Sequence, residues 1–280
     1  MSEPIDIDHL RGWIGKEDVA VEGLTAEKVR QFRATFDEEP GAPEAGEVAP
    51  RLMHWCLAQP VALTKALGPD GHPARGGFLP PVPLPRRMWA GGSLDFHDEI
   101  RVGDVVERAS RIESVEVKEG RTGTLCFVTV VHRISADGRA CLTERQDIVY
   151  RGLDSAPARA APEPAPAGEH VREVDASAPL LFRYSALTFN GHRIHYDHPY
   201  VTQVEGYPGL IVHGPLQATL LLRHAAEMKG APPARFSFRG LSPLFDNAPV
   251  MLHGTASDAG VKLWTARPGG PFGMTAEAGW

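Results

Sequence analysis

The sequence predicts an α+β fold composed of two similar halves. In the first half, three long β-branched segments are joined by short turns, one of them the hairpin dipeptide Asp137-Gly138, and these predict an antiparallel meander. The second half has a shorter set of strand-like segments and one strong helix over residues 216–228, which ends at Gly230 ahead of two prolines. A long helix beside an antiparallel sheet, occurring twice, is typical of the α+β class. The expected strands are 105–117, 124–134, 140–150, 250–257, 261–266 and 273–278.

A faint internal repeat is the second sign of two halves. Residues 25–37, a threonine-capped helix that runs into Thr-Phe-Asp, match residues 182–190, which run into Thr-Phe-Asn. Residues 93–106 also correspond to residues 237–250. Each match is weak alone, but both halves also end in strand-like segments. We therefore expect a duplicated unit.

The stretch between the halves is rich in alanine and proline. Residues 152–178 have a composition that cannot form a core and favours extended, semi-rigid chain. We therefore divide the chain into a first half (1–151), a linker (152–178) and a second half (179–280).

Charge and hydropathy exclude several classes of function. The 280 residues carry a net charge of −6, which argues against a nucleic-acid-binding surface. No apolar run approaches the length of a membrane span, and the acidic start lacks the basic-then-apolar order of a signal peptide. We expect a cytoplasmic protein with no nucleic-acid or membrane partner.

The three cysteines are scattered in apolar surroundings. Cys56, Cys126 and Cys141 have no CxxC spacing, so a disulfide framework or a zinc site is disfavoured and buried small hydrophobes are expected. The Gly- and Pro-rich segment 68–89 contains Phe, Leu, Val and Trp, which would be costly to expose. We expect an ordered loop that covers a pocket there, in preference to a proline-rich ligand for another protein.

The chemistry-bearing residues gather in one short polar run. Residues 189–197 read Phe-Asn-Gly-His-Arg-Ile-His-Tyr-Asp, and His213-Gly214-Pro215 follows soon after. Histidine is the natural general acid or base near neutral pH, so His195 is the first candidate for proton transfer. Asp197 could orient it, because side chains two residues apart share a face of an extended segment.

The glycine and proline at the helix start supply a second function. Gly214 at the cap and Pro215 in the first turn favour a helix N-terminus, whose free N–H groups and dipole hold negative charge. An enolate oxygen on a thioester is such a charge. The alternative is that Gly214 only makes a tight turn into a core helix, and this feature taken alone favours that alternative.

Other chemistries have less support. His192 and His195 have i, i+3 spacing and Asp197 could add an oxygen ligand, but the glycine and aromatic neighbours argue against a helix that would present them to a metal. Arg193 could bind a carboxylate or phosphate, or make only a surface salt bridge. There is no G-x-S-x-G elbow and no cysteine beside a histidine, so nucleophilic catalysis is disfavoured.

At these residues the sequence resembles the MaoC-like hydratase/dehydratase family of the hot-dog fold. Residues 194–197 and 211–214 match the family's catalytic loop and the start of its central helix. Residues 189–197 together with residues 83–92 resemble the subgroup of mitochondrial-type 3-hydroxyacyl-thioester dehydratases and bacterial mesaconyl-CoA and itaconyl-CoA hydratases. The resemblance spans nearly the whole chain.

The resemblance implies an α+β double hot dog, with two tandem halves that are each a helix wrapped by an antiparallel sheet. The second half should be catalytic, because it alone carries His195 and His213-Gly214. The first half has Asp37 at the comparable place but no histidine five residues later, so its implied role is to shape the acyl pocket.

One departure changes the implied mechanism. The family's catalytic Asp falls on Asn190, and an amide cannot act as a carboxylate base. We expect His195 to be the main acid/base, Asn190 to position the water and Asp197 to orient His195, with His192 in reserve as a second proton-transfer group. By resemblance, the backbone N–H of Gly214 should hold the thioester oxygen.

The implied substrate is a short, branched or dicarboxylic enoyl-CoA such as mesaconyl-CoA or itaconyl-CoA, hydrated reversibly without a metal or redox cofactor. The alternatives are a 3-hydroxyacyl-carrier-protein dehydratase, a non-catalytic acyl-CoA-binding protein and a thioesterase. A homodimer or higher homo-oligomer is compatible with the fold. The expected substrate-binding residues are Tyr184, His192, Arg193, His213, Arg86 and Arg87.

Overall fold

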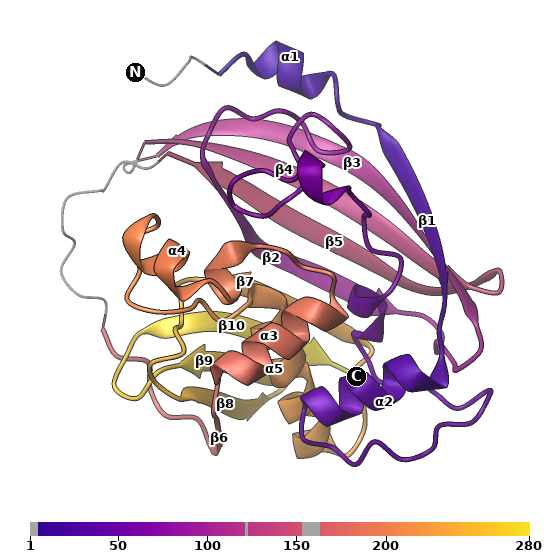
Figure 1. Ribbon diagram of the computed structural model, residues 1–280. Helices are drawn as coiled ribbons and strands as arrows, with labels where there is room; N and C mark the ends of the chain where they lie inside the picture. Colours follow the sequence, from indigo (N-terminus) through magenta and orange to yellow (C-terminus); the bar gives the residue numbers. More distant parts are fainter. Residues whose placement is uncertain (1–4, 121–122, 153–162) are drawn as a thin grey trace.

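Ten antiparallel strands form one continuous sheet in the computed structural model, which describes residues 5–120, 123–152 and 163–280 (Figure 1). The first half contributes the order β1-β3-β4-β5-β2 and the second half continues with β7-β10-β9-β8-β6. All six strands expected from the sequence are present, at β3 to β5 and β8 to β10. The strands are β1 (Glu17–Gly23), β2 (Arg86–Phe96), β3 (Val105–Gly120), β4 (Gly123–Ala136), β5 (Arg139–Arg151), β6 (His170–Val174), β7 (Arg235–Gly240), β8 (Val250–Ser257), β9 (Gly260–Ala266) and β10 (Phe272–Gly279).

The two halves have the same strand order when each is followed outward from the junction of β2 with β7. The order is β2-β5-β4-β3-β1 in the first half and β7-β10-β9-β8-β6 in the second. At the junction, Ser93 pairs directly with Ser237. The match of residues 93–106 with 237–250 is confirmed, because each segment begins in a junction strand and leads into β3 or β8. The double hot-dog fold is therefore confirmed.

Two ten-residue helices occupy equivalent places in the halves and pack on each other, α2 (Ala26–Thr35) and α3 (Ala178–Leu187). Thr25 caps α2, since its side chain accepts a hydrogen bond from the amide of Lys28 at 3.2 Å. The longest helix, α5 (Gly214–Lys229), contacts all four strands β7 to β10. None of the helices in the described ranges has the length and apolarity needed to cross a bilayer.

The expectation of a long helix in each half is wrong for the first half. Among the described residues there is no counterpart of α5: residues 36–85 form loops and the short turns η1 (Met53–Cys56) and η2 (Thr64–Ala66). Prolines and glycines recur throughout this stretch, and proline in a helix interior removes a hydrogen bond and clashes with the preceding turn. The remaining helices are α1 (Ile7–Arg11), η3 (Arg193–His195) and α4 (His198–Gln203).

The linker is shorter than the predicted 152–178. Residues 170–174 of that segment form β6, which pairs with β8 at the edge of the sheet, and Ala178 already begins α3. The sequence from His170 to Val174 lacks the alanines and prolines of the preceding stretch, so it can make a ladder of backbone hydrogen bonds. Residues 153–162 lie outside the described residues.

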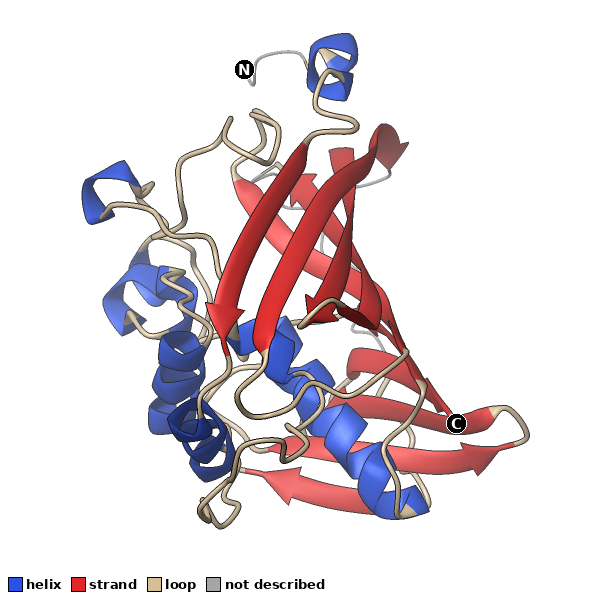
Figure 2. Ribbon diagram, turned by 90° about the vertical axis from the view of Figure 1, so that its right-hand side faces the viewer, coloured by secondary structure: helices blue, strands red, loops and turns tan. Residues whose placement is uncertain are grey.

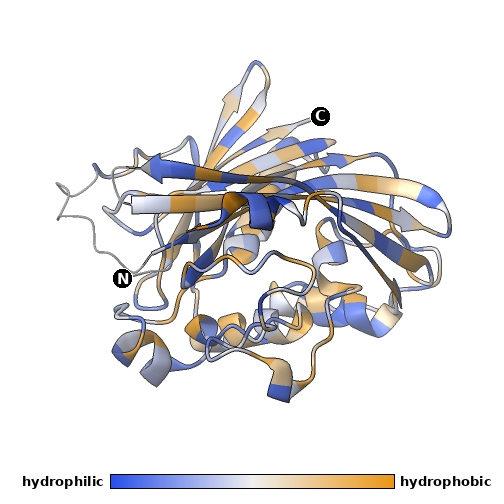
Figure 3. Cartoon of the chain, turned by 90° about the horizontal axis from the view of Figure 1, so that it is seen from above, coloured by the Kyte–Doolittle hydropathy of each residue, from blue (hydrophilic) through white to orange (hydrophobic). Residues whose placement is uncertain are grey.

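Hydrophobic and hydrophilic residues alternate along the long strands (Figure 3), as expected when one face of a sheet is covered. Helix α5 lies against the strands of the second half (Figure 2), while α3 packs on α2. Helix α5 is buried along most of its length, because the strands of the second half wrap around it. The three cysteines are free and buried, which confirms that they serve as small hydrophobic residues.

A buried polar network stiffens the first half. The carboxylate of Glu144, which is 3% exposed, accepts hydrogen bonds at 3.0 Å from His54 Nε2 and from Trp55 Nε1. Although burial raises it, the hydrogen bond from His54 holds the pKa of Glu144 below its ordinary value. The carboxylate on β5 therefore anchors the turn η1, which lies where a central helix would otherwise pack.

Replacement of Glu144 by alanine should destabilise the fold by about 3–5 kcal/mol, because it leaves two buried donors without their acceptor. The free energy of unfolding from chemical denaturation measures this. Glu107→Ala, on the exposed face of β3, is the matched control and should change stability by no more than about 0.5 kcal/mol. Equal effects of the two changes would contradict an anchoring role for Glu144.

Candidate active site

The loop between α3 and α4 carries the predicted catalytic residues and is held by its own backbone. The amide of Asn190 donates to the carbonyl of Ser185 at 2.8 Å. The side-chain oxygen of Asn190 accepts a hydrogen bond from the amide of His192 at 3.0 Å. This turn, with Phe189 at a φ of 49°, directs the chain into η3, where His195 lies. The acceptor of Asn190 is thus engaged with the backbone.

His195 is buried with its tautomer defined. Its Nδ1 donates to the carbonyl of Ile211 at 2.7 Å, because a carbonyl can only accept, and this leaves Nε2 as a proton acceptor. Burial lowers its pKa to about 4, although the bond to Ile211 opposes that shift. His195 is therefore a neutral imidazole near pH 7 that offers the Nε2 lone pair, as a general base requires.

His213 joins His195 to the start of α5. The two imidazole rings are stacked, with centroids 3.6 Å apart. His213 is the N-cap of α5 and is fully buried, and its Nε2 is hydrogen-bonded to Ser185 Oγ at 2.8 Å. Burial holds the pKa of His213 well below its usual range. The imidazole of His195 therefore lies directly beside the N-terminus of α5.

Tyr184 supports this arrangement from the core. It is 1% exposed and packs edge-on against His213, at a centroid distance of 5.1 Å, and against Phe36 of the first half. Tyr184 and His213 are thus both enclosed by the protein. Their direct contact with a substrate, expected from the sequence, stays a prediction.

The start of α5 has the properties expected of an anion-binding site. Gly214 is its first residue and Pro215 follows, so the amides of the first turn are not used by the helix itself. A Cβ on Gly214 would lie 3.9 Å from the carbonyl oxygen of Trp89 and 4.0 Å from Cε of Met274, which is ordinary contact. Strand β2 therefore passes beside the helix start.

Asp197 does not orient His195, contrary to the sequence-based expectation. Its carboxylate caps α4 by accepting from the amide of Tyr200 at 3.1 Å and binds the guanidinium of Arg193 at 2.8 Å. The carbonyl of Ile211 orients His195 instead. Arg193 is also committed locally, since it donates to the carbonyl of Pro69 at 2.9 Å. Both residues shape the loop.

The two arginines of β2 differ in their partners. Arg86 lies 3.7 Å from the carboxylate of Glu205 and donates to its backbone carbonyl at 3.2 Å. Arg87 has no carboxylate partner among the described residues, and its side chain interacts with the hydroxyl of Tyr150. Burial lowers the pKa of both His72 and His192, and the charge of Arg87 lowers both further.

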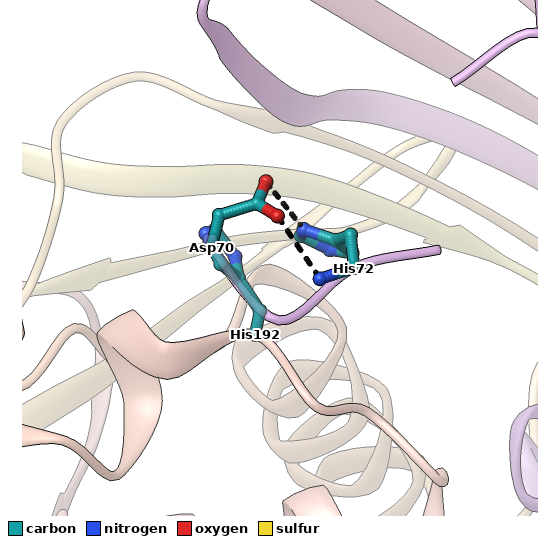
Figure 4. A group of neighbouring side chains, drawn as sticks. All are labelled: Asp70, His72 and His192. Carbon is teal, nitrogen blue, oxygen red and sulfur yellow. Dashed lines mark hydrogen bonds and ion pairs between the residues drawn. The ribbon is translucent and has the colours of Figure 1, made fainter. Parts of the chain in front are cut away.

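Asp70 and His72, which the sequence pattern does not single out, join the same cluster from the first half (Figure 4). His72 Nδ1 donates to the Asp70 carboxylate at 3.2 Å, and the His72 ring lies 4.1 Å from the ring of His192. The ring of His192 in turn meets that of His195 edge-on at 5.4 Å. In the sequence, the only signal for Asp70 and His72 is the tripeptide Asp-Gly-His within segment 68–89, which was expected to cover a pocket. Residues 70 and 71 of that segment do pack against the loop 189–197.

Asp70, His72 and His192 could also hold a metal ion, because one ligand atom from each lies within 4.8 Å of the others. The positive charge of Arg87 beside both imidazoles opposes a cation there. Asp197, which the sequence offered as an oxygen ligand for such a metal, is paired with Arg193 instead. The expectation that the protein needs no metal stays a prediction.

The sequence matches a family model described as hydroxyacyl-thioester dehydratase type 2 over residues 52–246. The chain belongs to this family. It is 42% identical over 266 residues to the mesaconyl-C(4)-CoA hydratase of Chloroflexus aurantiacus, covering 94% of this chain and 95% of the relative. It is 28% identical to the mitochondrial hydroxyacyl-thioester dehydratase type 2 of Schizosaccharomyces pombe, covering 77% of this chain and 79% of that one.

Solved structures similar to this type 2 dehydratase family member confirm the fold. A MaoC-like dehydratase from Phytophthora capsici matches with a TM-score of 0.70 at 14% identity, covering 99% of both chains. A Mycobacterium tuberculosis protein described as having a double hot-dog fold matches with a TM-score of 0.58 at 14% identity, covering 95% of both. The double hot-dog fold implied by the resemblance is therefore confirmed.

In this protein, Asp197→Ala should lower the free energy of unfolding and leave the pKa of His195 unchanged. Loss of the α4 cap should cost about 1 kcal/mol of unfolding free energy. The acid limb of the pH–rate profile should stay in place, because Asp197 contacts Arg193 and the α4 amides only. Chemical denaturation and kcat/KM against pH measure the two effects. A shifted acid limb would instead support the orienting role predicted from the sequence.

Proposed function

We propose that the protein is a hydro-lyase that reversibly adds water to a short enoyl-CoA carrying a free carboxylate, with mesaconyl-CoA as the first candidate and itaconyl-CoA as the second. The observation that carries the reaction type is the stack of neutral His195 on His213, the N-cap of α5, at 3.6 Å. It sets a proton acceptor beside a helix N-terminus. The 42% identity to a mesaconyl-C(4)-CoA hydratase supports the acyl class.

The helix start polarises the thioester. When water attacks the β-carbon of an enoyl thioester, the electrons of the double bond move toward the carbonyl, and negative charge develops on its oxygen. The free amides of the first turn of α5, with Gly214 at its start, are donors set in place for that charge. Donors of this kind are typically worth about 2.7–4 kcal/mol of barrier each.

His195 moves the proton. Its Nε2 accepts a proton from the attacking water as the bond from oxygen to the β-carbon forms, and the resulting imidazolium then protonates the α-carbon of the enolate. The dehydration direction uses the same steps in reverse. Water addition involves no net oxidation or reduction, so we expect no redox cofactor, and the CoA arm is part of the substrate.

The acyl carboxylate is assigned to Arg87. A mesaconate esterified to CoA at C4 carries a methyl group and a carboxylate on its β-carbon. Arg87 lies two residues along β2 from Trp89, whose carbonyl lies beside Gly214, and residues two apart in a strand are separated by about 6.6 Å. Its guanidinium interacts with the hydroxyl of Tyr150 and has no carboxylate partner among the described residues, so it is the β2 cation that we assign to the acyl carboxylate. The cytoplasmic location and any homo-oligomeric state stay predictions.

His195→Ala should lower kcat/KM for hydration by about 10²–10⁴-fold, the usual contribution of a general acid–base group. The assay follows the absorbance of the conjugated thioester with mesaconyl-CoA, itaconyl-CoA, crotonyl-CoA, a longer enoyl-CoA and an enoyl group on acyl carrier protein. On acidification the wild-type rate should begin to fall only below pH 6.5, because burial lowers the pKa of His195 to about 4.

Three results would contradict this function. Release of free thiol in step with substrate loss would identify a thioesterase. Tight binding of the whole panel without turnover would identify a non-catalytic acyl-CoA-binding protein. Turnover of the carrier-protein substrate alone would identify a 3-hydroxyacyl-carrier-protein dehydratase.

Arg87→Gln should raise KM for mesaconyl-CoA by about tenfold or more, because it removes a charge-assisted hydrogen bond worth about 1.5–3 kcal/mol. The KM for crotonyl-CoA, which has no second carboxylate, should stay within about twofold. Arg86→Gln is the matched comparison and should leave both values nearly unchanged, since Arg86 is already paired with Glu205. Equal KM increases for both substrates would mean that Arg87 binds the CoA portion.

A further inference from the structure

The proposed reaction leaves one hydrogen of the attacking water without an assigned acceptor. Water has two hydrogens, and His195 Nε2 accepts only one of them. The position that carries a carboxylate in the wider MaoC-like family is Asn190, whose side-chain oxygen already accepts from the amide of His192. The remaining amide group of Asn190 can only donate. The second hydrogen of the attacking water therefore needs another acceptor.

His72 is the imidazole of the first half that is prepared for this task. Both oxygens of Asp70 bind the same residue: one accepts from the backbone amide of His72 at 3.0 Å and the other from its Nδ1 at 3.2 Å. Because a carboxylate only accepts, Nδ1 carries the hydrogen and Nε2 presents a lone pair. His72 thus has the same tautomer as His195, and both rings contact that of His192.

Close backbone packing fixes His72 against the catalytic loop. Gly71 has a φ of +87°, and a Cβ there would lie 2.0 Å from the carbonyl oxygen of Gly191. The amide of Arg193 donates to the carbonyl of Asp70 at 2.9 Å, which ties the two loops together. A side chain at position 71 is excluded both by its backbone conformation and by the space. Two segments about 120 residues apart in sequence are therefore held in one geometry.

We propose that His72, oriented by Asp70, is a second catalytic residue that replaces the carboxylate missing at position 190. This rests on the proposed hydratase function. His72 Nε2 accepts the hydrogen bond from the water hydrogen that stays on oxygen, while His195 Nε2 takes the other hydrogen. The water O–H bond to His195 breaks as the β-carbon–oxygen bond forms, and His195 returns that proton to the α-carbon. The product hydroxyl remains hydrogen-bonded to His72.

The charges around His72 keep it a neutral acceptor. Burial lowers its pKa, the hydrogen bond to Asp70 raises it, and Arg87 and Arg75 lower it further. His192 and His195 face it from the second half, and burial lowers their pKa values to about 2 and about 4. A protonated His72 has no lone pair at Nε2. The wild-type activity is therefore lost as pH falls through the folded pKa of His72, below 6.5.

The test compares His72→Ala, His72→Gln and Asp70→Asn in the full-length protein, with hydration of mesaconyl-CoA as the assay. His72→Ala should lower kcat about 10²-fold. His72→Gln keeps an acceptor oxygen and should recover at least tenfold of that loss. Asp70→Asn removes the charge that raises the His72 pKa, so its acid limb should move to lower pH. His97→Ala, an exposed histidine bonded to Thr143, is the control and should match wild type.

Each other outcome has a definite meaning. Wild-type kcat in His72→Ala would overturn the role of His72 and leave the proposed function intact. Two results together would show that Asp70 and His72 only shape the loop. These are equal losses of kcat in His72→Ala and His72→Gln, and a pH–rate profile of Asp70→Asn whose acid limb does not move. Activity that is lost on dialysis against EDTA and restored by Zn²⁺ would assign Asp70, His72 and His192 to a metal. An inactive wild type across the whole substrate panel would reject the proposed function itself.

Discussion

The hydrogen bond from His195 Nδ1 to the carbonyl of Ile211 is the interaction on which the site depends. It joins the loop after α3 to the segment that enters α5, and the amide of Ile211 returns a bond to the carbonyl of Ile194. The same bond selects the tautomer of His195 and brings its ring onto His213. One contact therefore fixes both the tautomer of His195 and the distance of its ring from the start of α5.

Fusion of the two halves explains why one chain can complete this site by itself. The first half has no counterpart of α5 in the described ranges, and its irregular segment between α2 and β2 is free to reach across the junction. Glu144 anchors one part of that segment through η1, and the Gly71–Gly191 contact anchors another. The half that lost its helix thus supplies a loop to the half that kept it. A helix at that place would present its side chains along one rigid axis and could not follow the catalytic loop.

The parts that sequence reasoning could predict have a periodic or local physical cause. Alternation at 105–150 predicts the meander, and the Gly-Pro start and Gly230 stop predict α5 almost to the residue. His195 was found because local histidine density is unusual. The roles of Asp70, His72 and Asp197 depend on which irregular segments meet. No periodicity encodes a contact between residue 72 and residue 192, and an Asp two residues from a His has the same local signal whether it orients that His or caps the next helix.

The amide at position 190, where the resemblance implies a carboxylate, fits the proposed anionic substrate. An acyl group with a carboxylate on its β-carbon would bring that charge next to an aspartate placed to hold the attacking water. Two like charges about 4 Å apart repel by about 1 kcal/mol in water and about 4 kcal/mol at the effective dielectric near a protein surface. In the proposed arrangement the water contacts two neutral imidazoles, those of His72 and His195. The nearby carboxylate, Asp70, is hydrogen-bonded to His72, and the charge of Arg87 acts on the same imidazole. An amide at position 190 would thus avoid the repulsion, and His72 backed by Asp70 would supply the acceptor without exposing a second anion to the substrate.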